Sequence, residues 1–164
     1  MEKNLFRDNI INELKEKILK DPNNVNNYQN LANYYIGNSD YNSAALTYKE
    51  ILKLTPDDFQ ALTNLGSIYF YKKMFFEAID CFNKSIKKEP QNYTAYYNLG
   101  NVYAEVENFE AALTNYEKAL NLNPDKAEIY SALGYLYSDV NNYKVAIDNY
   151  EKALELDPNR SEER

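Results

Sequence analysis

Between residues 93 and 124, small, apolar and aromatic residues stand at intervals of three, four and seven, which is the spacing of helical faces. The same residue types return 34 positions earlier, 34 positions later and one further interval toward the N-terminus. Eight positions carry the pattern, and in its clearest copy they are Tyr96, Leu99, Gly100, Tyr103, Ala112, Tyr116, Ala119 and Pro124. All five prolines lie in one register of this interval, so the chain is built from a repeated unit.

Each unit predicts two helices separated by short turns. The expected spans are 25–38, 42–55, 59–72, 76–89, 93–106, 110–123, 127–140 and 144–157. A further helix is expected before them, because Phe6, Ile10, Ile11, Leu14 and Ile18 form one helical stripe. Glycine inside a helix costs about 1 kcal/mol relative to alanine, so Gly66, Gly100 and Gly134 predict places where two helices approach closely.

The pattern resembles the tetratricopeptide repeat, a 34-residue helix-turn-helix unit marked by an aromatic residue, Leu-Gly, Tyr, Ala, a second aromatic residue and a closing Pro. The resemblance covers residues 25 to 158. It implies an all-α fold, a right-handed α-solenoid superhelix of antiparallel helix pairs that binds other proteins. We expect a capping helix in residues 1–24, four repeats at 25–58, 59–92, 93–126 and 127–160, and a tail at 161–164.

The charge balance narrows the class of partner. The chain of 164 residues has 18 Lys and Arg against 25 Asp and Glu, a net charge of −7, which disfavours nucleic acid and favours a basic or neutral protein or peptide. The charged N-terminal stretch predicts neither a signal peptide nor membrane insertion. One cysteine cannot form an internal disulfide, so we expect a soluble, cytoplasmic protein.

Residues for catalysis are scarce. The chain has no histidine, the commonest general base and metal ligand, and none of its four glycines belongs to a phosphate-binding motif. Cys81 occupies the position of Thr47, Asn115 and Asn149 in the other repeats, and we interpret it as a partly exposed thiol without a catalytic role. We therefore expect a protein that is not an enzyme and that needs no cofactor and no metal.

The resemblance implies that the first helix of each repeat lines a concave groove. Residues between the repeat's landmark positions are the candidates for this surface, and we also place Thr63 and Ser131 there. The candidate peptide-binding residues are Asn26, Asn30, Asn33, Asn64, Ser67, Phe70, Tyr71, Tyr97, Asn98, Asn101, Glu105, Glu128 and Tyr135. This set is rich in amides and aromatics, becomes acidic toward its C-terminal end, and contains no Lys or Arg.

Two binding modes known for the family differ in their residues. The clamp that holds the C-terminal carboxylate of heat-shock chaperones uses basic residues, which the candidate set lacks. The superhelical arm of O-linked N-acetylglucosamine transferase instead holds an extended peptide with a ladder of asparagines before each Leu-Gly pair. Asn30, Asn64 and Asn98 match that ladder and Ala132 interrupts it. A carboxamide can pair with both N–H and C=O of a peptide, although asparagine is abundant throughout this chain.

Two further features leave other functions open. Phe70, Tyr71, Met74, Phe75 and Phe76 form an apolar cluster in repeat two, which marks either a contact site or packing on a neighbouring repeat. After Pro158 we expect no further helix to cover the last repeat. The alternatives to peptide binding are therefore a structural module that associates with itself through its repeat ends, and the targeting arm of a larger enzyme.

Overall fold

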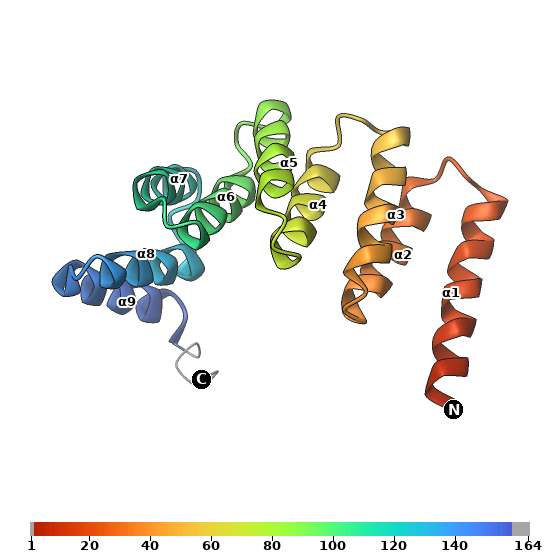
Figure 1. Cartoon of the computed structure of the whole chain (residues 1–164), viewed down its shortest axis with the longest axis horizontal. Helices are drawn as coiled ribbons and strands as arrows, with labels where there is room; N and C mark the ends of the chain where they lie inside the picture. The colour runs from red at the N-terminus through yellow and green to blue at the C-terminus, as the bar shows by residue number, and fades with distance from the viewer. Residues whose placement is uncertain (1, 159–164) are drawn as a thin grey trace. The chain divides into compact units, whose positions relative to one another are not determined.

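The computed structural model describes residues 2–158, with side chains from residue 8 onward, and this part of the chain is almost entirely helical (Figure 1). Its nine helices are α1 (Glu2–Lys20), α2 (Val25–Gly37), α3 (Tyr41–Leu54), α4 (Phe59–Tyr71), α5 (Phe75–Lys88), α6 (Tyr93–Glu105), α7 (Phe109–Leu122), α8 (Ala127–Asp139) and α9 (Tyr143–Leu156). The expected tail at 161–164 and the expected end of repeat four at residue 160 lie outside the described residues.

The first helix of each repeat begins at the predicted residue, whereas the second begins one residue earlier than predicted. The aromatic residues Tyr41, Phe75, Phe109 and Tyr143 are the first residues of these helices. The N-cap explains the shift, because the carboxylate of Asp40 accepts from the backbone N–H of Ser43 and fixes the helix start just before Tyr41. Asn108 caps α7 in the same way through Ala111.

The turns inside the four repeats share one backbone conformation. Ser39, Lys73, Glu107 and Asn141 all have φ of 58° or 59°, in the left-handed region. The next residue then donates its N–H to a carbonyl near the end of the first helix, as Asp40 does to Tyr35 and Asn142 to Tyr137, each at 2.8 Å. This 6→1 closure satisfies a carbonyl that the helix end leaves open, so the repeat is preserved in its turns as well as in its core.

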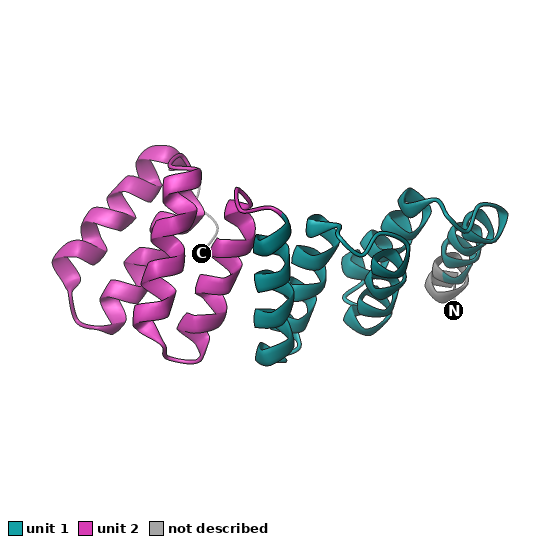
Figure 2. Cartoon of the chain, turned by 90° about the horizontal axis from the view of Figure 1, so that it is seen from above, with its two compact units in different colours: residues 1–88 teal, residues 89–164 magenta. Residues whose placement is uncertain are grey.

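The chain divides into two compact units (Figure 2). Unit 1 comprises residues 1–88 and unit 2 residues 89–164. In unit 1, α1 packs on α2, α2 pairs with α3, and α4 packs between α3 and α5. In unit 2, α6 pairs with α7 and α8 with α9, while α8 also contacts both α6 and α7. Consecutive helices therefore supply the core of each unit.

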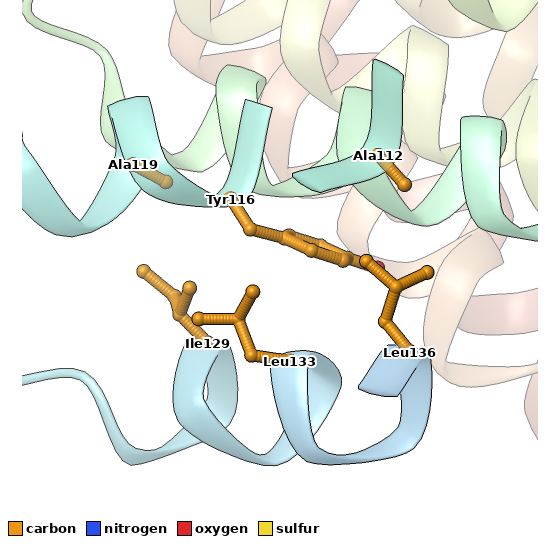
Figure 3. Packing of buried hydrophobic residues seen from close by; sticks show 6 residues of the cluster. All are labelled: Ala112, Tyr116, Ala119, Ile129, Leu133 and Leu136. Atoms are coloured by element: carbon orange, nitrogen blue, oxygen red, sulfur yellow. The ribbon is translucent and has the colours of Figure 1, made fainter. Parts of the chain in front are cut away.

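In unit 2, the core between repeats three and four is a cluster of apolar side chains (Figure 3). Ala112, Tyr116 and Ala119 of α7 face the apolar side chains of α8. Those partners are Ile129, which is fully buried, and Leu133 and Leu136, which are nearly so. Burying side chains of this size stabilises the helix pair by about 1.5–3 kcal/mol each relative to exposure, so apolar burial is the main force that holds α8 on α7.

The prediction of close helix contact at the three glycines is confirmed. A Cβ atom added to Gly66 would lie 2.7 Å from the ring of Phe82, and one added to Gly100 would lie 2.6 Å from the ring of Tyr116. The same atom on Gly134 would lie 2.5 Å from Tyr150. In each case an aromatic ring of the second helix rests on the glycine of the first, so any larger residue must displace the ring.

Candidate functional site

The candidate residues of unit 1 lie on α2 and α4. Asn26, Asn30 and Asn33 are spaced by four and three residues on α2, and all three are exposed. On α4, Tyr71 is exposed, whereas Asn64, Ser67 and Phe70 are half-buried. We call this set of seven residues the first-helix face of unit 1. It carries amides, two hydroxyls and aromatic rings, but no formal charge.

One amide of this face is already engaged inside the protein. The side chain of Asn64 hydrogen-bonds with the hydroxyl of Tyr48, and Nε2 of Gln29 donates to the same hydroxyl at 3.1 Å. Burial raises the pKa of Tyr48 above its usual range, while the hydrogen bonds with Asn64 and Gln29 lower it and the charge of Asp58 raises it. Asn64 therefore helps to hold α4 on α3 and offers a ligand only its remaining hydrogen-bonding capacity.

The candidate residues of unit 2 lie on α6 and α8, which contact each other directly. On α6, Glu105 is exposed and Tyr97, Asn98 and Asn101 are half-buried. On α8, Tyr135 is exposed and Glu128 is half-buried. We call these six residues the first-helix face of unit 2. It differs from the face of unit 1 in carrying two carboxylates and two tyrosines.

A tyrosine of the second helix also supports this face. The hydroxyl of Tyr116 donates to Oδ1 of Asn101 at 2.8 Å, and the ring of Tyr97 lies 6.0 Å from the Tyr116 ring. Burial, the larger effect, raises the pKa of Tyr116, and the neighbouring Tyr97 raises it further. Tyr135 rests in the same manner on Tyr150, edge to face at 5.5 Å. Tyr97, Asn101 and Tyr135 are thus oriented by contacts with α7 and α9.

The sequence predicted only a packing role for these supporting tyrosines, but they have a second one. Tyr48 and Tyr116 fill the core of their repeats, yet their hydroxyls reach Asn64 and Asn101 of the candidate set. The signal was present in the sequence, because the equivalent residue in repeat two is Phe82, which has no hydroxyl. A comparison of tyrosine with phenylalanine at this repeat position would have indicated which repeats carry a hydroxyl able to bond to a neighbouring side chain.

Two residues placed on the first-helix faces are buried, so their placement was wrong. The Thr63 hydroxyl donates to the carbonyl of Phe59 at 2.8 Å and lies 2.8 Å from the hydroxyl of Ser85. Ser131 is also buried, in unit 2. Their small polar side chains are accommodated inside the protein because a threonine or serine can bond to a carbonyl one helical turn earlier.

The expectation of a partly exposed Cys81 is also wrong. Its side chain is 6% exposed, and burial raises the pKa of its thiol to about 11, with a further contribution from Asp80. The residues at the same repeat position, Thr47 and Asn115, are buried too, and each donates to the carbonyl four residues earlier. Polar residues at this position therefore do not indicate exposure, and a protonated, buried thiol is a poor nucleophile.

The apolar cluster of repeat two separates into two parts. Tyr71 stacks on Tyr41 with ring centroids 5.4 Å apart, and Phe70 lies 6.1 Å from Phe75. Phe76, by contrast, is 89% exposed. One part of the cluster thus packs within repeats one and two, and Phe76 stands apart from it on the surface.

The net charge is distributed unevenly between the units. Residues 1–88 contain 12 Lys and Arg against 11 Asp and Glu, a net charge of +1. Residues 89–164 contain 6 Lys and Arg against 14 Asp and Glu, a net charge of −8. The acidic character of the chain therefore belongs to unit 2, and long-range attraction for a cationic partner is concentrated there.

Among the described residues, no group of three or more His, Cys, Asp or Glu is arranged to hold a metal ion. No helix in the described part of the chain has the length and apolar content to cross a membrane. The amides, tyrosines and carboxylates of the two first-helix faces can recognise another molecule at the surface. The fold and these faces define an all-α helical-repeat protein with the architecture of an interaction scaffold.

The chain belongs to the tetratricopeptide repeat family. Three models of this repeat match it, at residues 30–73, 66–107 and 91–159. No curated protein sequence matches the chain significantly.

Solved structures share the fold over nearly the whole chain. A crystal structure of MamA is 27% identical, with a TM-score of 0.81, and the match covers 98% of this chain and 94% of MamA. YrrB, a tetratricopeptide repeat protein with an unusual peptide-binding site, is 24% identical, with a TM-score of 0.71 and coverage of 91% and 77%. TTC0263 from Thermus thermophilus is 23% identical, with a TM-score of 0.77 and coverage of 93% and 84%.

Proposed function

We propose that the chain is an interaction scaffold whose first-helix faces bind an extended peptide segment of a partner protein, and that unit 2 selects basic peptides. The observation that carries the proposal is the first-helix face of unit 2. Two carboxylates, Glu105 and Glu128, accompany Tyr97 and Tyr135 on two helices that touch. Carboxylates pair with Lys and Arg side chains, and tyrosine rings attract the same cations through their faces.

The supporting contacts favour binding without large rearrangement. Tyr97 and Asn101 are fixed against Tyr116, and Tyr135 is fixed against Tyr150. Side chains that are already ordered lose less conformational entropy when a ligand arrives, which strengthens binding for the same contacts. An extended peptide gains from this arrangement because its own backbone is ordered only on binding.

The first-helix face of unit 1 suits the peptide backbone. Asn30 is exposed, and its side chain forms no hydrogen bond with the residues that the structure describes. Each carboxamide can donate to a peptide C=O and accept from a peptide N–H, so binding through Asn26, Asn30 and Asn33 would be insensitive to side-chain identity. Asn64 contributes less, because Tyr48 occupies part of its capacity.

The peptide-binding site of YrrB is an example of such a site on this fold. Because the likeness to YrrB lies in the fold alone, our proposal rests on the residues of this chain. A cytoplasmic location remains a prediction from the sequence, and the partner is defined only by its chemistry.

A peptide-library selection against the full chain tests the proposal. We expect enrichment of Lys- and Arg-containing sequences, reduced by the double variant Glu105→Gln and Glu128→Gln. The matched control is Glu110→Gln with Glu117→Gln, which removes two exposed carboxylates from α7 of the same unit. Loss of enrichment in the control as well would show a non-specific charge effect. No enrichment by the unmodified chain would contradict peptide binding altogether.

The amide contribution is tested separately. Asn30→Ala removes an exposed side chain that has no partner among the described residues, so it should leave the fold unchanged and weaken all selected peptides alike. Tyr48→Phe is the companion variant, because it releases Asn64 without deleting it. If Asn30→Ala binds every peptide as the unmodified chain does, the asparagines of unit 1 have no part in recognition.

A further inference from the structure

Unit 1 has an apolar hollow of about 400 Å³ that is separate from its first-helix face. Leu62, Leu65 and Tyr69 of α4 line it together with Leu52 of α3 and with Phe76 and Cys81 of α5. The charged residues Glu77, Asp80 and Lys84 of α5 complete the lining. A mainly apolar lining and a volume of this size suit the insertion of an apolar side chain from outside.

Phe76 stands at the rim of this hollow and is 89% exposed. The other repeats carry Asn42, Glu110 and Lys144 at the same position, so the repeat fold does not require an apolar residue there. A phenylalanine ring left in water forgoes the stabilisation of about 1.5–3 kcal/mol that burial would give it. An exposed ring beside an apolar hollow is typical of a docking surface.

Unit 2 exposes an apolar stripe of its own on α9. Tyr143, Ile147 and Leu154 are 59%, 54% and 43% exposed, and their spacing places them on one face of the helix. The equivalent residues of α7 are Phe109, Leu113 and Leu120, which pack on the core formed with α8. The stripe on α9 is therefore a surface of the kind that this fold elsewhere covers with another helix.

We propose that the α9 stripe of one copy docks on the Phe76 hollow of a second copy. The two apolar surfaces are complementary in shape, because one is a ridge of side chains on a helix and the other is a hollow lined by α3, α4 and α5. A single interface would then bury Phe76 and the α9 stripe together.

The charges that line the hollow are balanced locally, because Glu77, Asp80 and Lys84 of α5 all line it and Lys84 pairs with Asp80 at 2.6 Å. On α9, Asp148 and Glu151 are exposed beside the stripe. Charge acts instead at the level of the units, since net charges of +1 for unit 1 and −8 for unit 2 favour contact between unlike units over contact between two copies of unit 2.

The interface joins two different surfaces, so it is heterologous. Each bound copy still presents one free hollow or one free α9 stripe, and the association continues into chains unless the geometry closes a ring. Growth into chains distinguishes this heterologous contact from a symmetric dimer, which would stop at two copies.

The test is sedimentation of the full chain over a wide range of concentration. We expect species that grow with concentration, and association weakened about tenfold or more by either Phe76→Asn or Ile147→Asn. Both residues are exposed, and asparagine is the natural residue of repeat one at the Phe76 position, so both variants should fold. Leu19→Asn is the control, because Leu19 is 80% exposed on α1 and belongs to neither the hollow nor the α9 stripe.

Mixing the two variants gives the sharpest result. The Phe76→Asn chain keeps an intact α9 stripe and the Ile147→Asn chain keeps an intact hollow, so an equimolar mixture should form dimers and nothing larger. A mixture that stays monomeric would overturn the proposal, as would an unmodified chain that is monomeric at every concentration. Equal weakening by Leu19→Asn would also overturn it, because association would then not depend on the two surfaces named.

Discussion

The two units are built on the same repeat but present different chemistry on their first helices. Gly66 under Phe82 in unit 1 and Gly100 under Tyr116 in unit 2 form the same close contact. The faces beside these contacts diverge, with Asn26, Asn30 and Asn33 in unit 1 and Tyr97, Tyr135, Glu105 and Glu128 in unit 2. The charges diverge as well, from +1 to −8.

The comparison shows that packing fixes only some positions of the repeat. Landmark residues such as Leu99, Ala112 and Tyr116 are buried against neighbouring helices, where a change of one methyl group is costly. Some residues between the landmarks, such as Asn30 and Glu105, meet water, where substitution costs little. The two units can therefore have cores of the same design and still recognise different partners. The exposed residues that differ between the units are the candidates for function.

The largest expected effect concerns the thiol in unit 1, which reports on the opening of that unit alone. A rise of the Cys81 pKa from 9.0 to about 11 lowers the thiolate fraction near neutral pH about 100-fold. We expect alkylation by iodoacetamide to be slower than that of the unfolded chain by at least this factor, as followed by mass spectrometry. Alkylation at the unfolded rate would mean that unit 1 opens readily.

The same shift predicts a pH dependence. The folded state keeps the thiol proton longer than the unfolded state, so the unfolded chain loses it first as pH rises. Cys81 therefore reduces the free energy of unfolding as pH rises from about 9 to 11. Unfolding curves of the unmodified chain and of Cys81→Ala, compared across this pH range, measure how much the thiol contributes to the loss of stability.

Matched glycine substitutions compare the packing of the units. In Gly66→Ala the new methyl group meets Phe82, which is fully buried and has no room to move. Overpacking of about 1–3 kcal/mol against a gain of about 1 kcal/mol in helix propensity predicts a net loss of up to about 2 kcal/mol. In Gly134→Ala the methyl group meets Tyr150, which is half-buried and can shift, so the change should be smaller.

Urea unfolding followed by circular dichroism measures both glycine variants. Equal losses would show that Tyr150 is held as firmly as Phe82, and the packing difference between the units would disappear. A larger loss for Gly134→Ala would reverse the comparison.

Charge reversal tests the recognition difference directly. The double variant Glu105→Lys and Glu128→Lys should change the preference of unit 2 from basic to acidic peptides and lower its affinity for basic ones about tenfold, since each partly exposed ion pair contributes up to about 1 kcal/mol. Fluorescence anisotropy with labelled peptides measures the change. Unaltered binding of basic peptides would exclude these carboxylates from the site.

The smallest expected effects come from the tyrosines that orient the amides. Tyr48→Phe removes the hydrogen bonds with Gln29 and Asn64, and Tyr116→Phe removes the one to Asn101. A hydrogen bond contributes about 0.5–1.5 kcal/mol net, and the half-buried amides can turn to water, so we expect losses near 1 kcal/mol, larger for Tyr48→Phe. Thermal unfolding of the two variants compares them, and no loss in either would mean that these bonds are incidental.

The sequence predicted the helices and their pairing because the landmark residues recur at a fixed interval. It placed the second helices one residue late, because the side chains of Asp40 and Asn108 cap the helices so that each begins at the very next residue. It misjudged Cys81 and Thr63, because residue polarity is a poor guide where a side chain can bond to the carbonyl of its own helix. The contact of Tyr48 with Asn64 joins two repeats, and a pattern along one helix does not reveal it.

The most direct test of the proposed function is an NMR titration of the full chain, labelled with ¹⁵N, with an arginine-rich extended peptide and its glutamate-rich counterpart. We predict that the arginine peptide shifts amide signals on α6 and α8, around Tyr97, Glu105, Glu128 and Tyr135, and that the glutamate peptide does not. Equal shifts with both peptides, or shifts confined to other helices, would contradict the assignment of the first-helix face of unit 2 as a site for basic peptides.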